Sequence, residues 1–567
     1  MRRILTGAFL FLTVAIVFSG SVPNGFVRFD DYEYIVSNPH IREGLDAESA
    51  KWSFTAAGYA ANWHPLTWLS HAADISLACA LDLDWREPEN DIDLYTRDSG
   101  SLPMLVHAEN VLLHALCAVL LFCLLLALLR KCGGGSPVSD LTVALLTLLW
   151  ALHPLRVEVV AWASERKELL SVLFMLLTLL AYVKRRYFAA IPLFALALFA
   201  KPVAVTLPVI VFAYDWILRR EPFRRCFLRA LPFGVLAVVA SVLTVVSQDE
   251  ALHGAGDWTL VNRLLAPVEA PVVYLGQTFW PVGLTIDYAV PDWSTWPVFA
   301  AGLLLVAALV ATGVWYLVWR FRGKENAWLS LAAFAIVWVY IGLLPMLGVV
   351  KVGNQPHSDR YTYWIGCGAA AALVLALSRL PRNGRFSDSS LHLPLAIVLL
   401  VLSLVTFRLT RTWKDSETLL TRAVMSNFGV GNAQVLAEVM AVKTPQRLDW
   451  TVDMLRTVLE RRRTPVARAV LAYQLAAYAP GVSRTLFDGK KTSPFAEARM
   501  LADFALEDHP RDRTAEFACA AIAFADYREG KYESALTWMN RAIECGFVPK
   551  SHNVNLGVWK EKANVPK

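Results

Sequence analysis

Long apolar runs recur along the first 410 residues and constrain the fold of this chain more than any other feature. Most cover roughly 17 to 24 residues, the length a helix needs to cross about 30 Å of hydrocarbon at 1.5 Å per residue. With 56% hydrophobic residues and a mean hydropathy of +0.43, the chain carries more apolar surface than a water-soluble core can enclose. The pattern predicts an all-α, polytopic membrane protein with about eleven transmembrane helices.

The first run, Ile4–Phe18, follows two arginines and ends in small residues, which also fits a secretory signal peptide. We expect it to be retained, because cleavage would leave Asp30 and Asp31 near an unanchored N-terminus. The other expected spans are 105–129, 141–156, 168–183, 188–200, 203–218, 230–246, 296–319, 328–348, 361–379 and 392–408.

Basic residues set the expected orientation. If the N-terminus is cytoplasmic, every inner loop is basic, as the positive-inside rule requires. These loops carry Arg130 and Lys131; Lys184, Arg185 and Arg186; Arg219, Arg220, Arg224 and Arg225; Arg320, Arg322 and Lys324; and Arg379, Arg382 and Arg385. We therefore attribute the net charge of +6 to the basic inner loops that set the membrane topology, and we expect no nucleic-acid partner.

Three regions fall outside this pattern of spans. A first outer loop at 21–104 contains an acidic insert at about 81–102, and the proline-broken segment 262–286 is expected to be an outer interfacial or re-entrant helix. Residues 411–567 return to soluble polarity with helical periodicity, which predicts a degenerate helical-repeat domain of the tetratricopeptide type.

The 8 cysteines show no metal-ligand spacing; Cys519 and Cys545 are expected to be free thiols rather than a disulfide.

Carboxylates directly outside the first span are the first candidates for chemistry. In FDDYEYIVSNPHI, Asp30 and Asp31 lie where a carboxylate can take a proton from an attacking hydroxyl. A solvated loop start with a helix cap would look the same. A second polar group, NWHPLTWLSH followed by HAENVLLHAL, contains His64 and places His107 and His114 on one helical face. Packing of histidine and tryptophan at the interface explains that group as well as a polar site does.

The segment HPLRVEVVAWASERKELLS carries the densest set of charges beside the apolar runs. It starts at His153, and Pro154 suits the first turn of a helix, on which Glu158, Trp162 and Glu165 would share one face. Arg166 and Lys167 follow at once, at the depth of a lipid headgroup. An ordinary ion-paired loop is the alternative interpretation.

Two further segments offer cations. Lys201, in AKPVAVTLP, either snorkels to the surface or holds a phosphate as a point charge. In QPHSDRYTYW, Arg360 offers a fork of donors that suits phosphate oxygens, and Asp359 would orient or neutralise it. His357 and Tyr361 are its neighbours and candidate supporting residues.

These segments occur in a recognisable order between about residues 24 and 427. FDDYEYIVSNPHI, NWHPLTWLSHAADISL, HAENVLLHAL, ALHPLRVEVVAWASERKELLS, AKPVAVTLP, FWPVGL, LLPMLG with SDRYTY, and TWKDSETLLTRAV resemble the bacterial relatives of the transmembrane and tetratricopeptide-repeat O-mannosyltransferases. That family belongs to the glycosyltransferase C superfamily. The acidic insert and the few, eroded repeats depart from its pattern.

The resemblance implies transfer of a sugar from a polyprenyl-phosphate donor to a protein or glycan hydroxyl at the outer face of a bacterial cytoplasmic membrane. The C-terminal domain would then be periplasmic. By position, Asp30 and Asp31 match the family's catalytic acidic motif. The cations Arg360, Lys201, Arg166 and Lys167 would stabilise the leaving phosphate, with Glu158, His64, His153, Asp359, Tyr361 and His357 in support.

This chemistry requires no metal or other cofactor, although the Asp30–Asp31 pair could hold a divalent ion. Two other functions stay open: a lipid or glycan transporter, and a membrane-anchored assembly protein acting through its repeats. The clustering of polar residues at outer loops, without an evident inverted repeat, disfavours a transporter. An assembly protein would make the membrane charges dispensable and the region after 410 essential.

Overall fold

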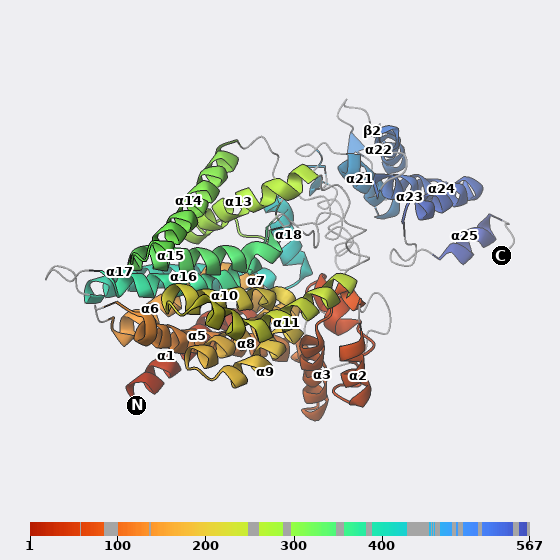
Figure 1. Ribbon diagram of the computed structural model, residues 1–567. Coiled ribbons are helices and arrows are strands. Elements are labelled where there is room, and N and C mark those ends of the chain that lie inside the picture. Colours follow the sequence, from red (N-terminus) through yellow and green to blue (C-terminus); the bar gives the residue numbers. More distant parts are fainter. Residues whose placement is uncertain are drawn as a thin grey trace. The chain divides into compact units, whose positions relative to one another are not determined.

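A computed structural model describes most of the chain, and its elements are shown in Figure 1. The described residues are 1–56, 58–83, 100–134, 138–247, 260–286, 288, 296–347, 357–380, 388–427, 453–454, 456–457, 459, 465–478, 484–485, 491–508, 513–547 and 555–563. Two compact units are separated between Asp415 and Ser416, close to the boundary expected at 410. The roles assigned to the two parts stay predictions.

The first unit is built from helices. Its longer elements are α1 (Arg2–Phe18), α3 (Pro65–Ala80), α5 (Ser101–Cys132), α6 (Asp140–Ala151), α8 (Arg166–Val183), α9 (Tyr187–Ala200), α11 (Phe223–Ser247), α13 (Leu260–Phe279), α14 (Trp296–Phe321), α15 (Ala327–Ile336), α16 (Thr362–Leu377) and α17 (His392–Thr410). Short helices and single turns connect them: η1 (Ser19–Ser21), η2 (Tyr32–Val36), α2 (Ala47–Thr55), η3 (Tyr59–Ala61), η4 (Pro154–Arg156), α7 (Val157–Ala161), η5 (Ala163–Glu165), η6 (Pro202–Thr206), α10 (Leu207–Ala213), η7 (Tyr214–Leu218), η8 (Val337–Ile341), η9 (Leu344–Met346), η10 (Asp359–Tyr361), η11 (Asp388–Leu391) and η12 (Arg411–Trp413).

The prediction of an all-α polytopic membrane protein is confirmed. Among the described residues, 7 helices are long and apolar enough to cross a membrane, or up to 8 if the bent pair Asp140–Ala151 and Pro154–Ala161 forms one span. The expected spans at 168–183, 188–200 and 203–218 coincide with α8, α9 and the segment from η6 to η7, which do not meet that standard. The count of about eleven therefore rests on these three shorter segments.

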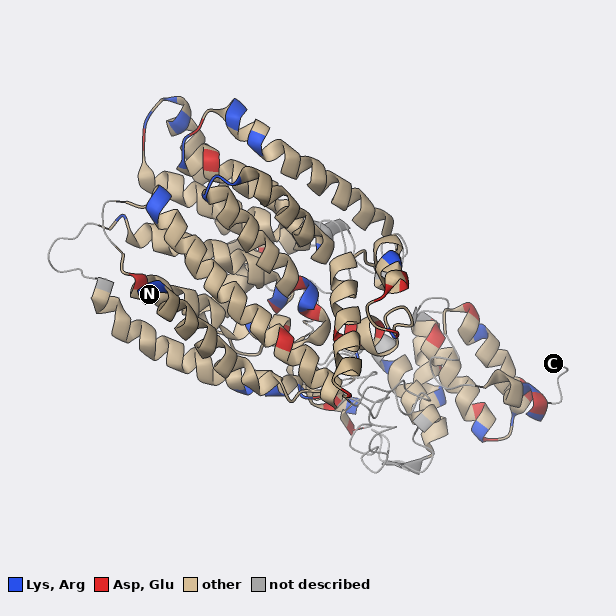
Figure 2. Cartoon of the chain, turned by 90° about the horizontal axis from the view of Figure 1, so that it is seen from below, with Lys and Arg blue, Asp and Glu red and all other residues tan. Residues whose placement is uncertain are grey.

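The packing of the helices determines which side chains are buried and which are exposed. Helices α5, α8, α9 and α11 form neighbouring pairs, in that order (Figure 1). α16 packs closely on α6 and η8. A Cβ on Gly366 would lie 2.7 Å from Cδ1 of Trp150 in α6, and one on Gly368 would lie 2.5 Å from Cγ of Trp338 in η8. By contrast, Leu304 of α14 and Leu393 of α17 are 73% and 71% exposed, as lipid-facing residues would be. Lysines and arginines gather near helix ends, while the helix lengths are largely uncharged (Figure 2).

The helix predicted to carry Glu158, Trp162 and Glu165 on one face is broken, so that prediction is wrong. α7 ends at Trp162, whose φ and ψ of −92° and 117° are extended. Helical structure resumes in η5 and then in α8. The backbone groups released by the break are satisfied locally, since the Asn110 amide donates to the carbonyls of Trp162 and Ala163. The break directly precedes the charged SERKELL sequence, whose Glu165, Arg166, Lys167 and Glu168 are all buried.

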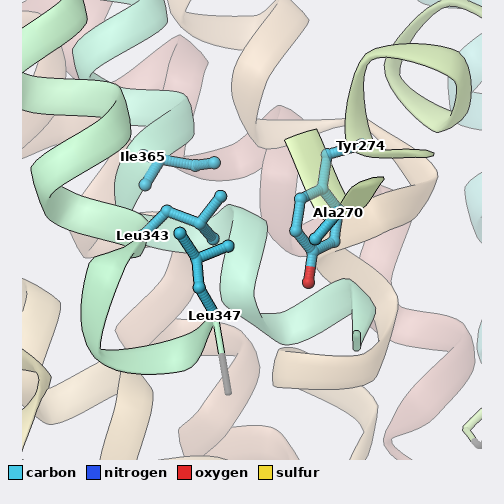
Figure 3. Close-up of a cluster of buried hydrophobic side chains, with 5 residues drawn as sticks. All are labelled: Ala270, Tyr274, Leu343, Leu347 and Ile365. Atoms are coloured by element: carbon cyan, nitrogen blue, oxygen red, sulfur yellow. The ribbon is translucent and has the colours of Figure 1, made fainter. Parts of the chain in front are cut away.

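The segment expected to be an interfacial or re-entrant helix contains α13, which continues through Pro267 and Pro271. Its Ala270 and Tyr274 pack into a buried cluster with Leu343, Leu347 and Ile365 (Figure 3). The Tyr274 hydroxyl accepts a hydrogen bond from the backbone N–H of Ser358. α13 thus supports the turn that carries Arg360, whatever its depth in a bilayer.

The second unit is also mainly helical. It contains α18 (Ser416–Asn427), α21 (Pro465–Tyr478), α22 (Pro494–Asp508), α23 (Arg513–Arg528), α24 (Tyr532–Glu544) and α25 (Leu556–Lys562), with the antiparallel two-residue strands β1 (Arg484–Thr485) and β2 (Lys491–Thr492). α21 packs on α22 and α23, and α23 packs on α24. Cys519 and Cys545 are free thiols, as expected. The repeat assignment stays a prediction, and most of its first helix, VDMLRTVLERRR, lies outside the described residues, as does most of the acidic insert.

Candidate active site

The two adjacent aspartates after α1 have different environments. Asp31 is fully buried and accepts hydrogen bonds from the backbone N–H groups of Val27 and Ser164, at 3.0 and 2.8 Å. The side chain of Asp30 is 41% exposed, and its Oδ2 accepts a hydrogen bond from Nζ of Lys167 at 2.8 Å. Burial raises the pKa of Asp31 to about 7, although the two backbone donors oppose the shift. Asp31 therefore ties the loop after α1 to η5, while Asp30 faces a charged network.

That network begins with the first turn of α8 and the end of α9. Lys167 contacts Asp30 and also lies 3.5 Å from Oε1 of Glu165. Lys201, which follows α9, lies 2.9 Å from Glu165 and 3.0 Å from Glu168. Three stretches of the chain that are distant in sequence thus meet through alternating anions and cations.

Arg360 closes the network from η10. Its backbone N–H donates to Oε2 of Glu158 at 2.9 Å, and its Nη1 donates to Oε1 at 2.5 Å. Its Nε lies 3.7 Å from Glu165. Glu165 is therefore close to all three cations of the network. Asp30, Glu158 and Arg360, which sequence reasoning expected to converge, do so through Lys167 and Glu165. We call the seven residues Asp30, Glu158, Glu165, Lys167, Glu168, Lys201 and Arg360 the site network.

Aromatic rings lie against two of the three cations, Lys167 and Arg360. Nζ of Lys167 lies 4.3 Å from the ring centre of Tyr34 and 5.6 Å from that of Trp162. The guanidinium of Arg360 lies 5.5 Å from the ring centre of Trp162 and 5.0 Å from that of Tyr361. Such contacts attract the cations through the ring faces and limit their hydration. Trp162 contacts both cations because the helix breaks at that residue.

Two pKa shifts follow from this geometry. Burial by itself raises the pKa of Glu165, but Lys201, Lys167 and Arg360 outweigh it and lower the value to about 2. For Lys201, burial lowers the pKa, but Glu165 and Glu168 together raise it above its ordinary value. Glu165 is thus a carboxylate and Lys201 an ammonium at neutral pH, which keeps fixed opposite charges inside the site.

Arg166, expected to bind the donor phosphate, is held elsewhere. Its guanidinium donates to Asp74, Asn110 and the carbonyl of Val106, and it lies 2.8 Å from Glu109. All three of its nitrogens are used in joining α3, α5 and α8. We correct its assignment from phosphate binding to structural support.

The histidines expected in the site have separate places. Nε2 of His153 contacts the carbonyl of Thr278, and its Nδ1 accepts from the backbone of Leu155, so His153 caps η4. His64 shares a 3.3 Å hydrogen bond with the Tyr34 hydroxyl, directly beside the network. Burial, followed by the charges of Lys167 and Lys201, lowers the pKa of His64 well below its ordinary value. His64 is therefore a neutral imidazole.

The segment around Arg360 contributes further support. The Tyr288 hydroxyl donates to Asp359 at 2.7 Å, and the ring of Tyr288 stacks on His357 with 4.3 Å between ring centres. Burial lowers the pKa of His357 to about 4. Glu158, rather than Asp359 alone, is the carboxylate that sets the orientation of Arg360.

Sequence reasoning did not select Glu168 or Tyr34 as site residues, and it left Glu165 in the motif without a role. The signal was present for the two glutamates, because SERKELL places two carboxylates and two cations within four consecutive positions beside an apolar run. Tyr34 gave no such signal, since a tyrosine near an interface is common.

A metal held jointly by the two aspartates does not fit this arrangement. Both carboxylate oxygens of Asp31 accept backbone hydrogen bonds, whereas Asp30 pairs with Lys167. Within the described ranges, no group of three or more His, Cys, Asp or Glu side chains is arranged to hold a metal ion.

A comparison with known proteins finds a distant relative. The chain is 27% identical over 182 residues to the Mus musculus protein O-mannosyl-transferase TMTC4. This match supports a relation to the transmembrane O-mannosyltransferase family. It covers 29% of this chain and 23% of the mouse protein, so less than a quarter of that relative is matched. No family model and no solved structure matches the chain.

Proposed function

We propose that the protein is a membrane glycosyltransferase that moves a sugar from a polyprenyl-phosphate donor to a hydroxyl of a protein or glycan acceptor. The site network carries the proposal: three cations and the exposed carboxylate of Asp30 meet at one place in a bundle of apolar helices. A lipid-linked phosphosugar needs such a combination of a base, phosphate-binding cations and access from a bilayer. The similarity to an O-mannosyl-transferase supports the same class of reaction.

Asp30 is the base in this mechanism. It accepts the proton of the acceptor hydroxyl while the hydroxyl oxygen attacks the anomeric carbon of the sugar. The bond between that carbon and the phosphate oxygen breaks, and its electron pair leaves with the lipid phosphate. Asp31 is less suited to this role because it is fully buried and both of its oxygens accept backbone hydrogen bonds.

Lys167, Lys201 and Arg360 stabilise the charge that gathers on the departing phosphate. In the free site each is paired with a carboxylate, which keeps its position fixed before the donor arrives. Preorganised cations of this kind favour the transition state because they need little rearrangement during the reaction. The aromatic cover from Tyr34, Trp162 and Tyr361 limits the access of water, which would otherwise compete with the acceptor.

The proposed localisation is a bacterial cytoplasmic membrane, with the site at its outer face and residues 416–567 on the extracytoplasmic side. The basic loops between the early spans support this orientation. The C-terminal helices would then be available to the acceptor.

A transfer assay tests the proposal. Purified full-length protein would receive radiolabelled polyprenyl-phosphate sugar and an extract of extracytoplasmic proteins and glycans. We expect label to appear in the acceptor fraction, and to be lost in Asp30→Asn but kept in Glu48→Gln, which removes an exposed carboxylate of the same loop. Label that crosses a vesicle membrane without being transferred would favour a transporter instead. Equal transfer by both variants would reject Asp30 as the base.

A further inference from the structure

The site network has more negative than positive groups. Its carboxylates are Asp30, Glu158, Glu165 and Glu168, and its cations are Lys167, Lys201 and Arg360. All seven are at most half-exposed, and only Asp30 has substantial contact with solvent. With every group ionised, the network carries one net negative charge before any donor is bound. An anionic donor would add a further negative charge, which water screens poorly among buried groups.

Glu168 is the least satisfied of these carboxylates. Its side chain is 1% exposed and its ion pair is with Lys201, the ammonium that also pairs with Glu165. Although Nζ of Lys201 lies 3.0 Å from Oε2 of Glu168, this buried oxygen has no aligned hydrogen-bond donor. Glu165, by contrast, has Lys201, Lys167 and Arg360 around it. A buried charge without a full set of partners is costly, so Glu168 is where a proton reduces the cost most.

The groups that face Glu168 come from several elements. They are Lys201, Glu165, Arg360, Arg156, Cys117 and Cys367. Arg156 is a fourth cation, whose Nη2 donates to the neutral hydroxyl of Thr362 at 2.8 Å, and the two thiols carry no positive charge in either form. Counting Arg156 with the network, the free site is balanced. Among these described neighbours no further cation is left to balance an anionic donor, so the charge of the donor leaves the site with an excess of negative charge.

We propose that Glu168 carries a proton whenever the anionic donor is bound, so that the site takes up the donor and one proton together. The inference rests on the proposed function and adds to it a role for a residue that does not touch the acceptor. Protonation makes the network neutral, and Lys201 is then shared by Glu165 and the phosphate instead of by two carboxylates. Glu168 is a positioning residue in this scheme, acting through Lys201.

Binding measurements at several pH values test this. The probe is a polyprenyl-phosphate mannose, a phosphodiester whose single negative charge is constant across the neutral range. Its Kd for the full-length protein in detergent would be measured for the native chain and for Glu168→Gln. In the native chain we expect the Kd to rise by up to about tenfold per pH unit on the alkaline side. In Glu168→Gln, which keeps the volume but not the charge, we expect the low-pH affinity at every pH.

Two further measurements, of proton uptake and of the effect of Mg²⁺, decide the outcome. In weak buffer on the alkaline side, binding to the native protein should take up about one proton per donor, measured with an indicator dye, and this reading does not depend on a variant that folds. Native binding that is independent of pH, or uptake of no proton, would overturn the inference while leaving the proposed function intact. Restoration of alkaline affinity by Mg²⁺ would show that a metal supplies the charge, which also overturns it. If no donor binds at any pH, the proposed function fails and the inference fails with it.

Discussion

Two of the networks of buried and half-buried ion pairs in the first unit differ in the balance of their charges. The site network sets four carboxylates against three cations, and one carboxylate oxygen of Glu168 lacks an aligned donor. A second network is centred on Asp215 in η7. There Arg219, Arg229 and the Tyr182 hydroxyl donate to Asp215, and Arg219 and Arg225 donate to Glu221. We call these residues the Asp215 network.

In the Asp215 network the carboxylates have a full set of hydrogen-bond donors. Both oxygens of Asp215 and both oxygens of Glu221 accept hydrogen bonds, and the three arginines outnumber the two carboxylates. It joins η7 to the start of α11 and to α8, within an expected basic inner loop. A network with satisfied anions and spare cations suits a structural clamp near lipid headgroups, whereas one with a partly exposed base and an excess of anions suits chemistry. The same residue types thus serve different purposes according to their balance and exposure.

The largest expected effect comes from Arg360→Gln. It removes the cation that Glu158 holds, together with a donor to the leaving phosphate. We expect transfer to fall by about 10²- to 10³-fold, the range found when a preorganised donor to a developing charge is lost. Initial rates with saturating donor would measure this. A rate within twofold of the native value would mean that Arg360 does not act on the reaction and that the two networks are alike in function.

Asp215→Asn is the counterpart in the Asp215 network. It leaves Arg219 and Arg229 facing an amide, at a residue with no exposed surface. Breaking a buried pair from one side typically lowers the free energy of unfolding by about 3 to 5 kcal/mol, and the partial exposure of these arginines favours the lower value. Thermal unfolding in detergent would report the loss, while the Kd for the donor should be unchanged in the folded fraction. A weakened donor Kd without loss of stability would break the comparison.

Asp31 gives a smaller, pH-dependent effect. Its folded pKa of about 7 lies above the ordinary value of 3.8, so the folded state holds this proton more tightly than the unfolded state. The stability from this group is complete below about pH 4 and is lost as the pH rises through about 7. Asp31→Asn should remove this component, and it should also cost about 1 to 3 kcal/mol, because an amide N–H₂ would face a backbone N–H. Unfolding temperatures of the two proteins across that pH range would show whether their difference changes with pH; a constant difference would contradict the account.

The smallest effect is expected for Arg225→Gln at the rim of the Asp215 network. Arg225 donates to Glu221 at 2.7 Å, but its side chain is 59% exposed. Exposed ion pairs contribute about 0.2 to 1 kcal/mol. Thermal unfolding should therefore change little, and transfer not at all. A loss as large as that of Asp215→Asn would show that the rim, rather than the buried centre, stabilises this network.

Much of the fold could be predicted from the sequence, because apolar runs and loop charges are local properties. The charged motifs that meet in the site were also visible, since a lysine or glutamate beside an apolar run is expensive and stands out. Three features were not visible. The break at Trp162 depends on Asp31 and Asn110 capturing the released backbone groups. Arg166 forms ion pairs with Asp74 and Glu109, which lie on other helices.

The third feature is the difference in environment and role between Asp30 and Asp31. Two adjacent aspartates look equivalent in a sequence, and only the position of Lys167 and Ser164 distinguishes them. All three features depend on contacts between residues more than fifty positions apart, which no local pattern encodes.

The most direct test separates binding from transfer in Asp30→Asn. Labelled polyprenyl-phosphate sugar would be bound to the native protein and to the variant, and a single turnover would then be started with acceptor. If Asp30 is the base of the site network, the variant binds the donor with a Kd close to the native one and transfers the sugar about 10²- to 10⁴-fold more slowly. Transfer at the native rate by a variant that binds donor normally would contradict the account.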